Sequence, residues 1–213
     1  MSSRAALISL ATAGLLLSTS ALRAQVLLPL TVTGDAARGE TLAYTCSGCH
    51  GVDSSVNAYP NYHVPKLGGQ NADYLEIALQ GYRNGSRAHD TMHGQGSQLS
   101  DQDIADVAAW FASIEGEAAT GILAADRDAI AAGQEKSMTC QACHGATGIA
   151  GSPQWPNLAG QHHSYLVEAI RQYQRGERTD LVMAPLVSQL DEEAIGQIAA
   201  FYASQSGLFQ TPR

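Results

Sequence analysis

The sequence predicts an all-α protein made of two tandem units of similar size. Two observations lead to this prediction: one motif with its flanking residues occurs twice, and the apolar residues of each copy recur at helical spacing. The chain has 213 residues, enough for two small domains, and its composition, 45% hydrophobic and 15% charged, is that of a globular protein. We expect both units to be helical domains without strands.

The first residues have the pattern of a secretory signal peptide. Arg4 precedes an apolar run over residues 5–17, and small residues ending at Ala24 suit a cleavage site. The run is shorter than the roughly 20 residues that a membrane-spanning helix needs, although an uncleaved anchor is the alternative. We therefore predict that residues 1–24 are a signal peptide and that the protein is exported. It should be soluble or only peripherally associated with a membrane.

The chain is acidic, with a formal net charge of −8, which becomes −10 when Arg4 and Arg23 leave with the signal peptide. This charge disfavours nucleic acid and anionic membrane surfaces as partners, and it favours a partner with a basic docking patch. Net charge bears on association and not on chemistry, so the function has to be inferred from the motifs.

The repeated motif is Cys-x-x-Cys-His-Gly, at residues 46–51 and again at 140–145, an offset of 94. Further along, the two copies stay aligned at an offset of 91, because the first copy has three extra residues after its histidine. So long a common register indicates a tandem duplication. We predict one domain over residues 25–114, a linker over 115–127 and a second domain over 128–213. The pairs that keep the offset of 91 include Pro65/Pro156, Gln70/Gln161, Tyr74/Tyr165, Tyr82/Tyr173, Arg87/Arg178 and Met92/Met183.

Each unit should contain a first helix that runs into the cysteine motif, capped by Asp35 in one copy and by Asp128 in the other. Gly39 and Gly133 lie within these first helices, where glycine is unfavourable unless another helix crosses closely. We expect such crossings at Trp110 and Phe201. A middle helix ends at Asn84-Gly85, and a last helix begins after Ser100. The apolar residues expected to be buried are Leu75, Leu79, Tyr82, Ile104, Val107, Ala108 and Phe111, and, in the second copy, Leu166, Ile170, Tyr173, Ile195, Ile198, Ala199 and Tyr202.

The cysteine motif predicts covalent haem. Two thiols about one helical turn apart can each add to one of the two vinyl groups of a porphyrin, and the adjacent histidine then meets the iron. A disulfide, a thioredoxin-like pair and a zinc site are the alternatives. The thioredoxin-like pair needs a strand–helix unit, and zinc sites place their cysteine pairs closer together. The thioether residues would be Cys46, Cys49, Cys140 and Cys143, and the proximal ligands would be His50 and His144.

Met92 and Met183 are the predicted distal ligands of the two irons. Met1 lies in the signal peptide, and Met138 is too close to Cys140 to reach the opposite haem face. Met92 and Met183 follow their histidines by 42 and 39 residues, and the difference is the three-residue insertion. A methionine that simply packs in the core is the alternative for each of them.

Two histidines near Met92 compete with it for the first iron. His89 and His93 are matched by Asp180 and Ala184 in the second copy, so neither belongs to the repeated design, and we interpret both as loop residues. Three further histidines are expected to be solvated surface residues, and two of them open a helix. These are His63, His162 and His163.

The ligand set indicates electron transfer. An iron held by His on one side and Met on the other has no vacant position, so we expect an electron carrier of high potential and not an enzyme, with no small-molecule substrate. The alternative is the cytochrome subunit of a larger dehydrogenase, for instance one that oxidises sulfide or an alcohol, whose catalytic part is another chain.

These motifs together resemble the diheme cytochrome c4 family, over nearly the whole mature chain. The resemblance rests on the two Cys-x-x-Cys-His-Gly motifs, the elements 65–70 and 156–161, and Met92 with residues 99–106. It implies two cytochrome c domains related by a pseudo-two-fold axis and a periplasmic carrier in a respiratory chain, with redox partners such as a membrane oxidase or reductase. Residues 52–63 depart from the family pattern because this stretch is longer than usual.

Overall fold

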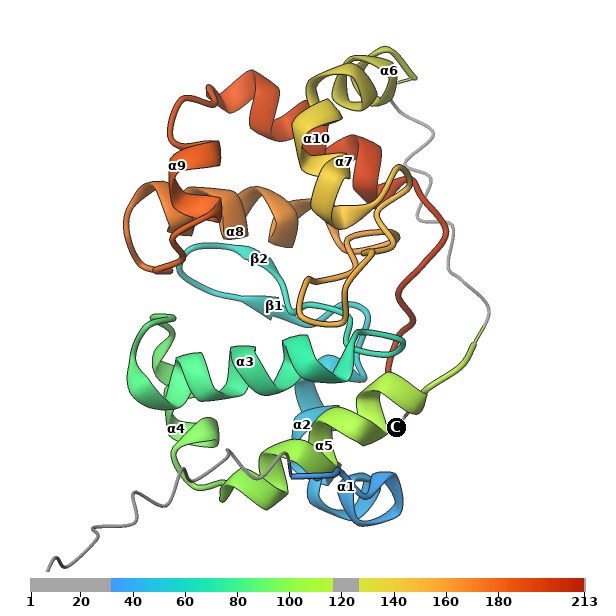
Figure 1. The fold of residues 1–213 in the computed structure, drawn as a ribbon, viewed down its shortest axis with the longest axis vertical. Helices are drawn as coiled ribbons and strands as arrows, with labels where there is room; N and C mark the ends of the chain where they lie inside the picture. Colours follow the sequence, from blue (N-terminus) through green and yellow to red (C-terminus); the bar gives the residue numbers. More distant parts are fainter. Residues whose placement is uncertain (1–31, 117–126, 213) are drawn as a thin grey trace, which may run out of the picture. The chain divides into compact units, whose positions relative to one another are not determined.

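The structure is a computed structural model that describes residues 32–116 and 127–212. The predicted signal peptide and most of the predicted linker lie outside these ranges. Within them, helices account for nearly all regular structure (Figure 1). The elements are α1 (Ala36–Leu42), α2 (Tyr44–His50), β1 (Val56–Asn57), β2 (Tyr62–His63), α3 (Ala72–Asn84), α4 (Asp90–Gly96), α5 (Asp101–Ser113), α6 (Arg127–Lys136), α7 (Met138–His144), α8 (His163–Gln174), α9 (Met183–Val187) and α10 (Glu192–Ala203).

Each predicted first helix is divided into two short helices just before the cysteine motif. The division falls at Ala43 between α1 and α2, and at Ser137 between α6 and α7. The Asp35 carboxylate caps α1, as predicted, by accepting from the backbone N–H groups of the first turn. The prediction that Asp128 caps α6 is wrong, because α6 begins at Arg127. Asp128 lies in the first turn, where its charge still suits the helix dipole.

Two glycines allow the first and last helices of each half to cross closely. A Cβ atom on Gly39 would lie 2.0 Å from the carbonyl oxygen of Asp106, and one on Gly133 would lie 1.9 Å from that of Gln197. Only glycine permits such an approach. The predicted crossings are therefore confirmed. The nearest side-chain carbons would be the Cβ atoms of Trp110 and Phe201, at 2.9 and 3.0 Å, as expected.

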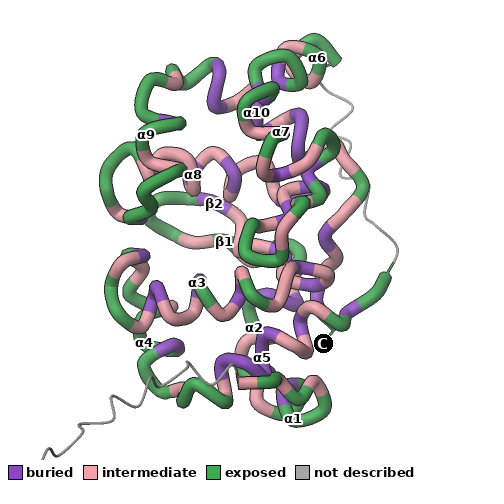
Figure 2. The backbone as a smooth tube through the Cα atoms, in the orientation of Figure 1, coloured by how far each residue is buried: buried purple, intermediate pink, exposed green. Residues whose placement is uncertain are grey.

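The core of each half lies along its last helix, α5 or α10. Figure 2 shows buried residues gathered on α5 and α10, while α1 is largely exposed. The α5 helix begins with a capping box between Ser100 and Asp103, and α3 ends at Gly85 with a positive φ of 82°, both as predicted. The residues predicted for the last helices are buried: Ile104, Val107, Ala108 and Phe111 in α5, and Ile195, Ile198, Ala199 and Tyr202 in α10.

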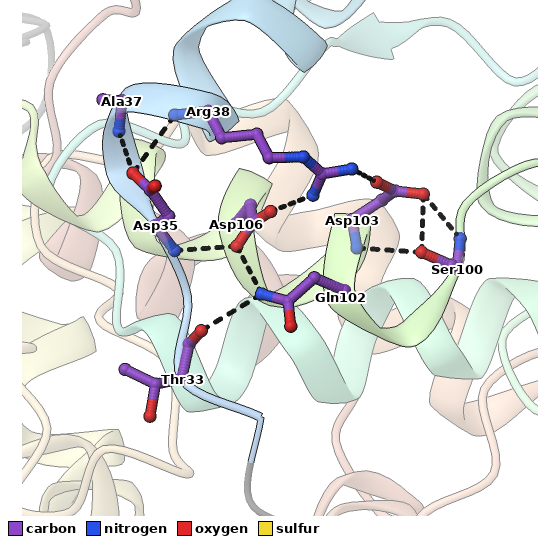
Figure 3. A network of polar contacts seen from close by, with 8 residues as sticks. All are labelled: Thr33, Asp35, Ala37, Arg38, Ser100, Gln102, Asp103 and Asp106. Carbon is purple, nitrogen blue, oxygen red and sulfur yellow. Dashed lines mark hydrogen bonds and ion pairs between the residues drawn. The ribbon is translucent and has the colours of Figure 1, made fainter.

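A polar network fastens α1 to α5 in the first half (Figure 3). The fully buried Asp106 carboxylate accepts from the backbone N–H of Asp35 at 2.7 Å and from the Gln102 amide at 2.8 Å. The Arg38 guanidinium pairs with both Asp106 and Asp103. The buried charge is thus compensated on several sides.

The expectation of a protein without strands is wrong in one place. Val56–Asn57 and Tyr62–His63 form a two-stranded antiparallel hairpin, in which Val56 pairs with His63. It falls in the longer stretch of the first half, and in Figure 1 it lies between α3 and α8. Strands of two residues are too short to show an alternating pattern, which is why the sequence did not reveal them.

The two halves are joined by reciprocal hydrogen bonds. The Gln70 amide donates to the carbonyl of Asn157 at 3.0 Å and accepts from its N–H at 2.8 Å. The Gln161 amide makes the same pair of bonds, both at 3.0 Å, with the backbone of Lys66. Since each partner is shifted by 91 residues, these contacts obey the predicted pseudo-two-fold symmetry. Within the described residues, no helix has both the length and the apolar character needed to cross a bilayer.

Candidate functional site

The motif histidines end the short helices α2 and α7, and both are buried. The Nδ1 atom of His50 lies 2.7 Å from the carbonyl oxygen of Pro65, and that of His144 lies 3.0 Å from that of Pro156. A carbonyl can only accept, so Nδ1 carries the proton and Nε2 keeps its lone pair. Burial lowers the pKa of both imidazoles, against the opposing effect of the carbonyl bond. Neutral rings with a free Nε2 have the form required of metal ligands.

The four cysteines lie on the same two helices. All four thiols are free, and no group of three or more metal-binding side chains among the described residues is placed to hold an ion. Cys46 and Cys140 pack against the apolar core of their own halves. Burial raises the pKa of both thiols. In each half, therefore, a cysteine that packs against the apolar core and a histidine with a free Nε2 lie on the same short helix, an arrangement that fits covalent haem.

The two methionines occupy equivalent turns. Met92 lies in the first turn of α4, and Met183 begins α9. The N–H of Met92 donates to Nδ1 of His89 at 3.3 Å, and the N–H of Met183 donates to the Asp180 carboxylate at 2.7 Å. His89 and Asp180 are themselves equivalent in the repeat. In each half, the N–H of the methionine donates a hydrogen bond that holds its turn. The acceptor is a histidine in the first half and an aspartate in the second. Met138, by contrast, is 68% exposed.

The interpretation as loop residues holds for His89, which lies in extended backbone just before α4, and is wrong for His93, which lies within α4. His89 is the N-cap of α4, and its Nε2 atom lies 3.2 Å from the Asn57 amide nitrogen. His93 lies within α4, with its Nδ1 atom 2.8 Å from the carbonyl oxygen of Tyr82. Both nitrogens of His89 therefore have protein partners, which suits a capping role.

The expectation that His63, His162 and His163 are solvated is also wrong. The His63 and His162 rings stack with centroids 4.9 Å apart, and Nδ1 of His63 lies 2.9 Å from the Ser164 hydroxyl. Burial, together with the charge of Lys66, lowers the pKa of His162 to about 4. His163 bonds the carbonyl of Gly196. All three histidines are half-buried, and the hairpin contributes for His63 and His162, because β2 brings His63 against the start of α8.

Two residues were missed as functional candidates. Arg87 and Arg178 belong to the repeat, but no role followed from the sequence. Both guanidinium-bearing side chains are buried, at 9% and 5% exposure. Their repetition after a glycine, at Gly85 and Gly176, was the signal that could have identified them.

Comparisons with known proteins agree with this arrangement. Residues 36–115 match the family described as cytochrome c, and residues 128–201 match the family described as cytochrome C oxidase, cbb3-type, subunit III. The crystal structure of reduced recombinant cytochrome c4 from Pseudomonas stutzeri is similar with a TM-score of 0.69. It is 30% identical, and the match covers 81% of this chain and 100% of that chain.

Two curated relatives extend the likeness along most of the sequence. The thiosulfate dehydrogenase electron acceptor of Stutzerimonas stutzeri is 31% identical over 176 residues, 76% of this chain and 79% of that protein. Cytochrome c4 of Pseudomonas aeruginosa is 33% identical over 182 residues, 79% of this chain and 87% of that protein. With its two Cys-x-x-Cys-His motifs for two covalently bound haem c groups, this chain belongs to the cytochrome c4 family of diheme electron carriers.

Proposed function

We propose that the chain is a periplasmic electron carrier in which each half holds one haem through its own cysteines, histidine and methionine. Thioether bonds form at Cys46 and Cys49 in one half and at Cys140 and Cys143 in the other. The axial ligands are His50 with Met92, and His144 with Met183. The observation that carries this assignment is the free Nε2 atom of each buried motif histidine, whose other nitrogen is held by a proline carbonyl.

The domain division follows the repeat. The first domain covers residues 25–114 and the second covers 128–213, with the linker 115–127 between them. The two family matches, 36–115 and 128–201, support this division. Helix α6 begins at Arg127, so the last residue assigned to the linker belongs to the second domain.

The ligand set supports transfer of single electrons and not catalysis. When bound, each haem iron cycles between its ferrous and ferric forms and so takes up or releases one electron. His50 with Met92, and His144 with Met183, would hold each iron from both sides, which would leave no position for a substrate. A redox protein is the expected partner. The acidity of the chain favours a partner with a basic docking surface.

Localisation can be tested directly. A signal peptide over residues 1–24 predicts a mature protein that begins after Ala24 and is released by osmotic shock. Intact-mass measurement of the released protein should show the chain without its leader plus two haem masses. A retained leader in the membrane fraction would contradict the periplasmic assignment.

The axial ligands can be tested by substituting each methionine. In the oxidised protein a sulfur–iron bond gives a weak charge-transfer band at the edge of the near infrared. Met92→Ala should remove about half of this band and Met183→Ala the other half, while both variants keep two covalent haems. The control is Met138→Ala, because that methionine is exposed and should leave the band unchanged.

One result in the first half would contradict the assignment of Met92 as a ligand. If Met92→Ala leaves the band intact while His93→Ala changes the spectrum, then a histidine is the ligand in that half. His89→Ala is expected to weaken the band only moderately, because His89 holds the N–H of Met92 and does not replace its sulfur.

A second candidate function is that of an electron-accepting partner of a dehydrogenase. It is favoured by the likeness to the thiosulfate dehydrogenase electron acceptor. Purified oxidised protein should then be reduced rapidly when mixed with a thiosulfate-oxidising enzyme and thiosulfate. Reduction no faster than that of an unrelated c-type cytochrome would argue against this candidate and leave the carrier assignment untouched.

A further inference from the structure

Residues 208–212, which we call the C-terminal segment, follow α10 but pack against the first half (Figure 1). The N–H of Leu208 donates to the carbonyl of Ala159 at 2.8 Å, and that of Phe209 donates to the carbonyl of Gly68, also at 2.8 Å. Gly68 and Ala159 are equivalent in the repeat, since they are 91 residues apart. Two successive residues of the segment thus bind the same carbonyl in both halves.

The first half has room for this segment at a glycine. The N–H of Gly68 donates to the carbonyl of Phe209 at 3.2 Å, which completes an antiparallel bridge. A Cβ atom on Gly68 would lie 2.9 Å from that carbonyl oxygen, whereas the second half has an alanine at the equivalent position. The ring of Phe209 lies over Gly69, where a Cβ atom would be 3.0 Å from two ring carbons. The backbone and the ring of Phe209 are therefore both seated on the first half.

The C-terminal segment then reaches the cysteine motif of the first half. The side-chain amide of Gln210 donates to the backbone carbonyl of His50 at 2.5 Å, although the two residues are 160 positions apart. Thr211 is only 3% exposed. A Cβ atom on Gly51 would lie 3.2 Å from the carbonyl oxygen of Thr211 and 3.4 Å from that of Pro212. A side chain that follows the last helix of the second half thus contacts the motif histidine of the first.

The second motif is surrounded in a different way. Gly145 has a positive φ of 78°, and a Cβ atom there would lie 1.9 Å from the carbonyl oxygen of Ile149, a residue of its own loop. Gly51, its equivalent, has a φ of −91°, and the chain beyond it continues into the hairpin. The first motif therefore obtains from a distant segment a backbone contact that the second motif obtains from the loop directly after it.

We propose that the C-terminal segment helps to hold His50 as a ligand of the first iron, and that Gln210 is the positioning residue. The inference rests on the proposed function, in which His50 is that ligand. His50 is held at two points: its Nδ1 atom by the carbonyl of Pro65 at 2.7 Å, and its own carbonyl by Gln210. The first bond orients the ring. The second fixes the backbone at the end of α2, from which the ring extends.

Loss of this contact should lower the electron affinity of the first haem alone. The amide N–H of Gln210 places a positive partial charge at the ligand residue, and His50 is only 7% exposed with the segment in place. Both a positive partial charge and exclusion of water favour the ferrous form, because it carries one positive charge less than the ferric form. The second haem, with His144 as its ligand, serves as an internal reference.

The test is a redox titration of the full holoprotein, in which the two haems are told apart with Met92→Ala and Met183→Ala. Gln210→Ala should lower the equilibrium constant for reduction of the first haem by roughly threefold, and Gln210→Glu, which replaces the donor by a negative charge, by roughly tenfold. The second haem should be unchanged in both variants. Removal of residues 209–213 keeps the buried Leu208 and should act at least as strongly as Gln210→Ala.

The matched control is Gln205→Ala. Gln205 precedes the C-terminal segment, and its side-chain amide donates to the carbonyl of Phe201 and the hydroxyl of Ser204, both in its own half. This variant should leave both equilibrium constants unchanged. An effect of Gln210→Glu that is equal on the two haems, or no larger than that of the control, overturns the proposal.

A second readout separates positioning from a purely structural contribution. In the oxidised protein the iron shifts the NMR signals of its histidine ligand, and these shifts depend on the orientation of the ring. Gln210→Ala should move the ring signals of His50 and leave those of His144 in place. A lower free energy of unfolding with unmoved His50 signals overturns the positioning role. Two covalent haems with an intact charge-transfer band and unchanged potentials refute only the role of Gln210, whereas a wild-type protein that lacks the first haem refutes the proposed function.

Discussion

The two halves make the same helix crossing by partly different means. Both use a glycine against a backbone carbonyl, Gly39 on α5 and Gly133 on α10. The first half adds the ion-pair network around Asp106. The second half has Gln197 at the equivalent position; its side-chain amide donates to Glu193 at 2.9 Å, and within the described residues its buried side-chain oxygen has no hydrogen-bond partner. Because the second half forms the crossing without the network, the glycine is the common requirement and the network is an addition.

The hairpin is the second difference between the halves. It belongs to the first half, yet its side chains contact the second, where Tyr62 lies 6.3 Å from the ring of Tyr165 and His63 stacks on His162. The second half has no counterpart among the described residues. An insertion of three residues has therefore added contacts at the junction of the halves without changing the repeated helices.

The largest effect is expected at the crossings. Gly39→Ala and Gly133→Ala should each lower the free energy of unfolding by about 3 kcal/mol or more, because the new methyl group would overlap a carbonyl oxygen. The control is Gly196→Ala in α10, whose Cβ would meet open space and should gain about 0.5–1 kcal/mol. Denaturant unfolding of the holoprotein measures all three. A much smaller loss at Gly133 would show that only the first crossing is rigid.

A smaller loss is expected in the hairpin. Tyr62 is 5% exposed, and Tyr62→Ala should lower the free energy of unfolding by about 2–3 kcal/mol. Tyr59 lies in the same hairpin but is 96% exposed, so Tyr59→Ala should stay within about 0.5 kcal/mol of wild type. If Tyr62→Ala and Tyr59→Ala change the free energy of unfolding equally, in thermal or chemical unfolding, then the hairpin does not pack on the second half.

A fall in pH should destabilise the contact between His63 and His162 before it affects the ion-pair network around Asp106. The pKa of His162 is lowered to about 4 in the folded chain, compared with about 6.5 in the unfolded chain. Between these two pH values the unfolded chain is protonated at His162 and the folded chain is not. Stability is therefore lost as the pH falls from about 6.5 to 4. After allowance for screening at this partly exposed ring, we expect a loss of about 1–2 kcal/mol.

The control for this loss is His162→Gln, whose stability should be less sensitive to pH over the same interval.

The ion-pair network around Asp106 should lose its contribution to stability only at lower pH. Hydrogen bonds from Ser100, aided by Arg38, lower the pKa of Asp103 to about 2, so its contribution is lost only below about pH 4. Identical pH profiles of wild type and His162→Gln would rule out His162 as the source.

The smallest effect concerns the caps of the last helices. Ser100 caps α5 and Asp191 caps α10, and each accepts a hydrogen bond from a backbone N–H of the first turn. Ser100→Ala and Asp191→Ala should each cost about 1 kcal/mol. Ser100→Ala should be the more damaging, because it also breaks the capping box with Asp103. The reverse order in unfolding experiments would show that the box adds nothing.

The duplication, the helical fold and the glycines at the helix crossings could all be predicted from the residue pattern. The pattern also placed the haem-binding motifs, because these depend on local spacing and on residue chemistry that each copy repeats. The helix caps at Asp35 and Ser100 were equally predictable, since an N-cap is a contact between residues two or three positions apart.

The loss of contact with water could not be predicted for individual polar groups, because it depends on packing between residues far apart in the chain. His63 and His162 are 99 residues apart, and they stack because the hairpin packs on α8. The pairing of Arg87 with Arg178 depends on how the halves meet. Burial and charge compensation arise from residues distant in sequence, so a local pattern could identify these side chains as repeated or solvated but not as partners.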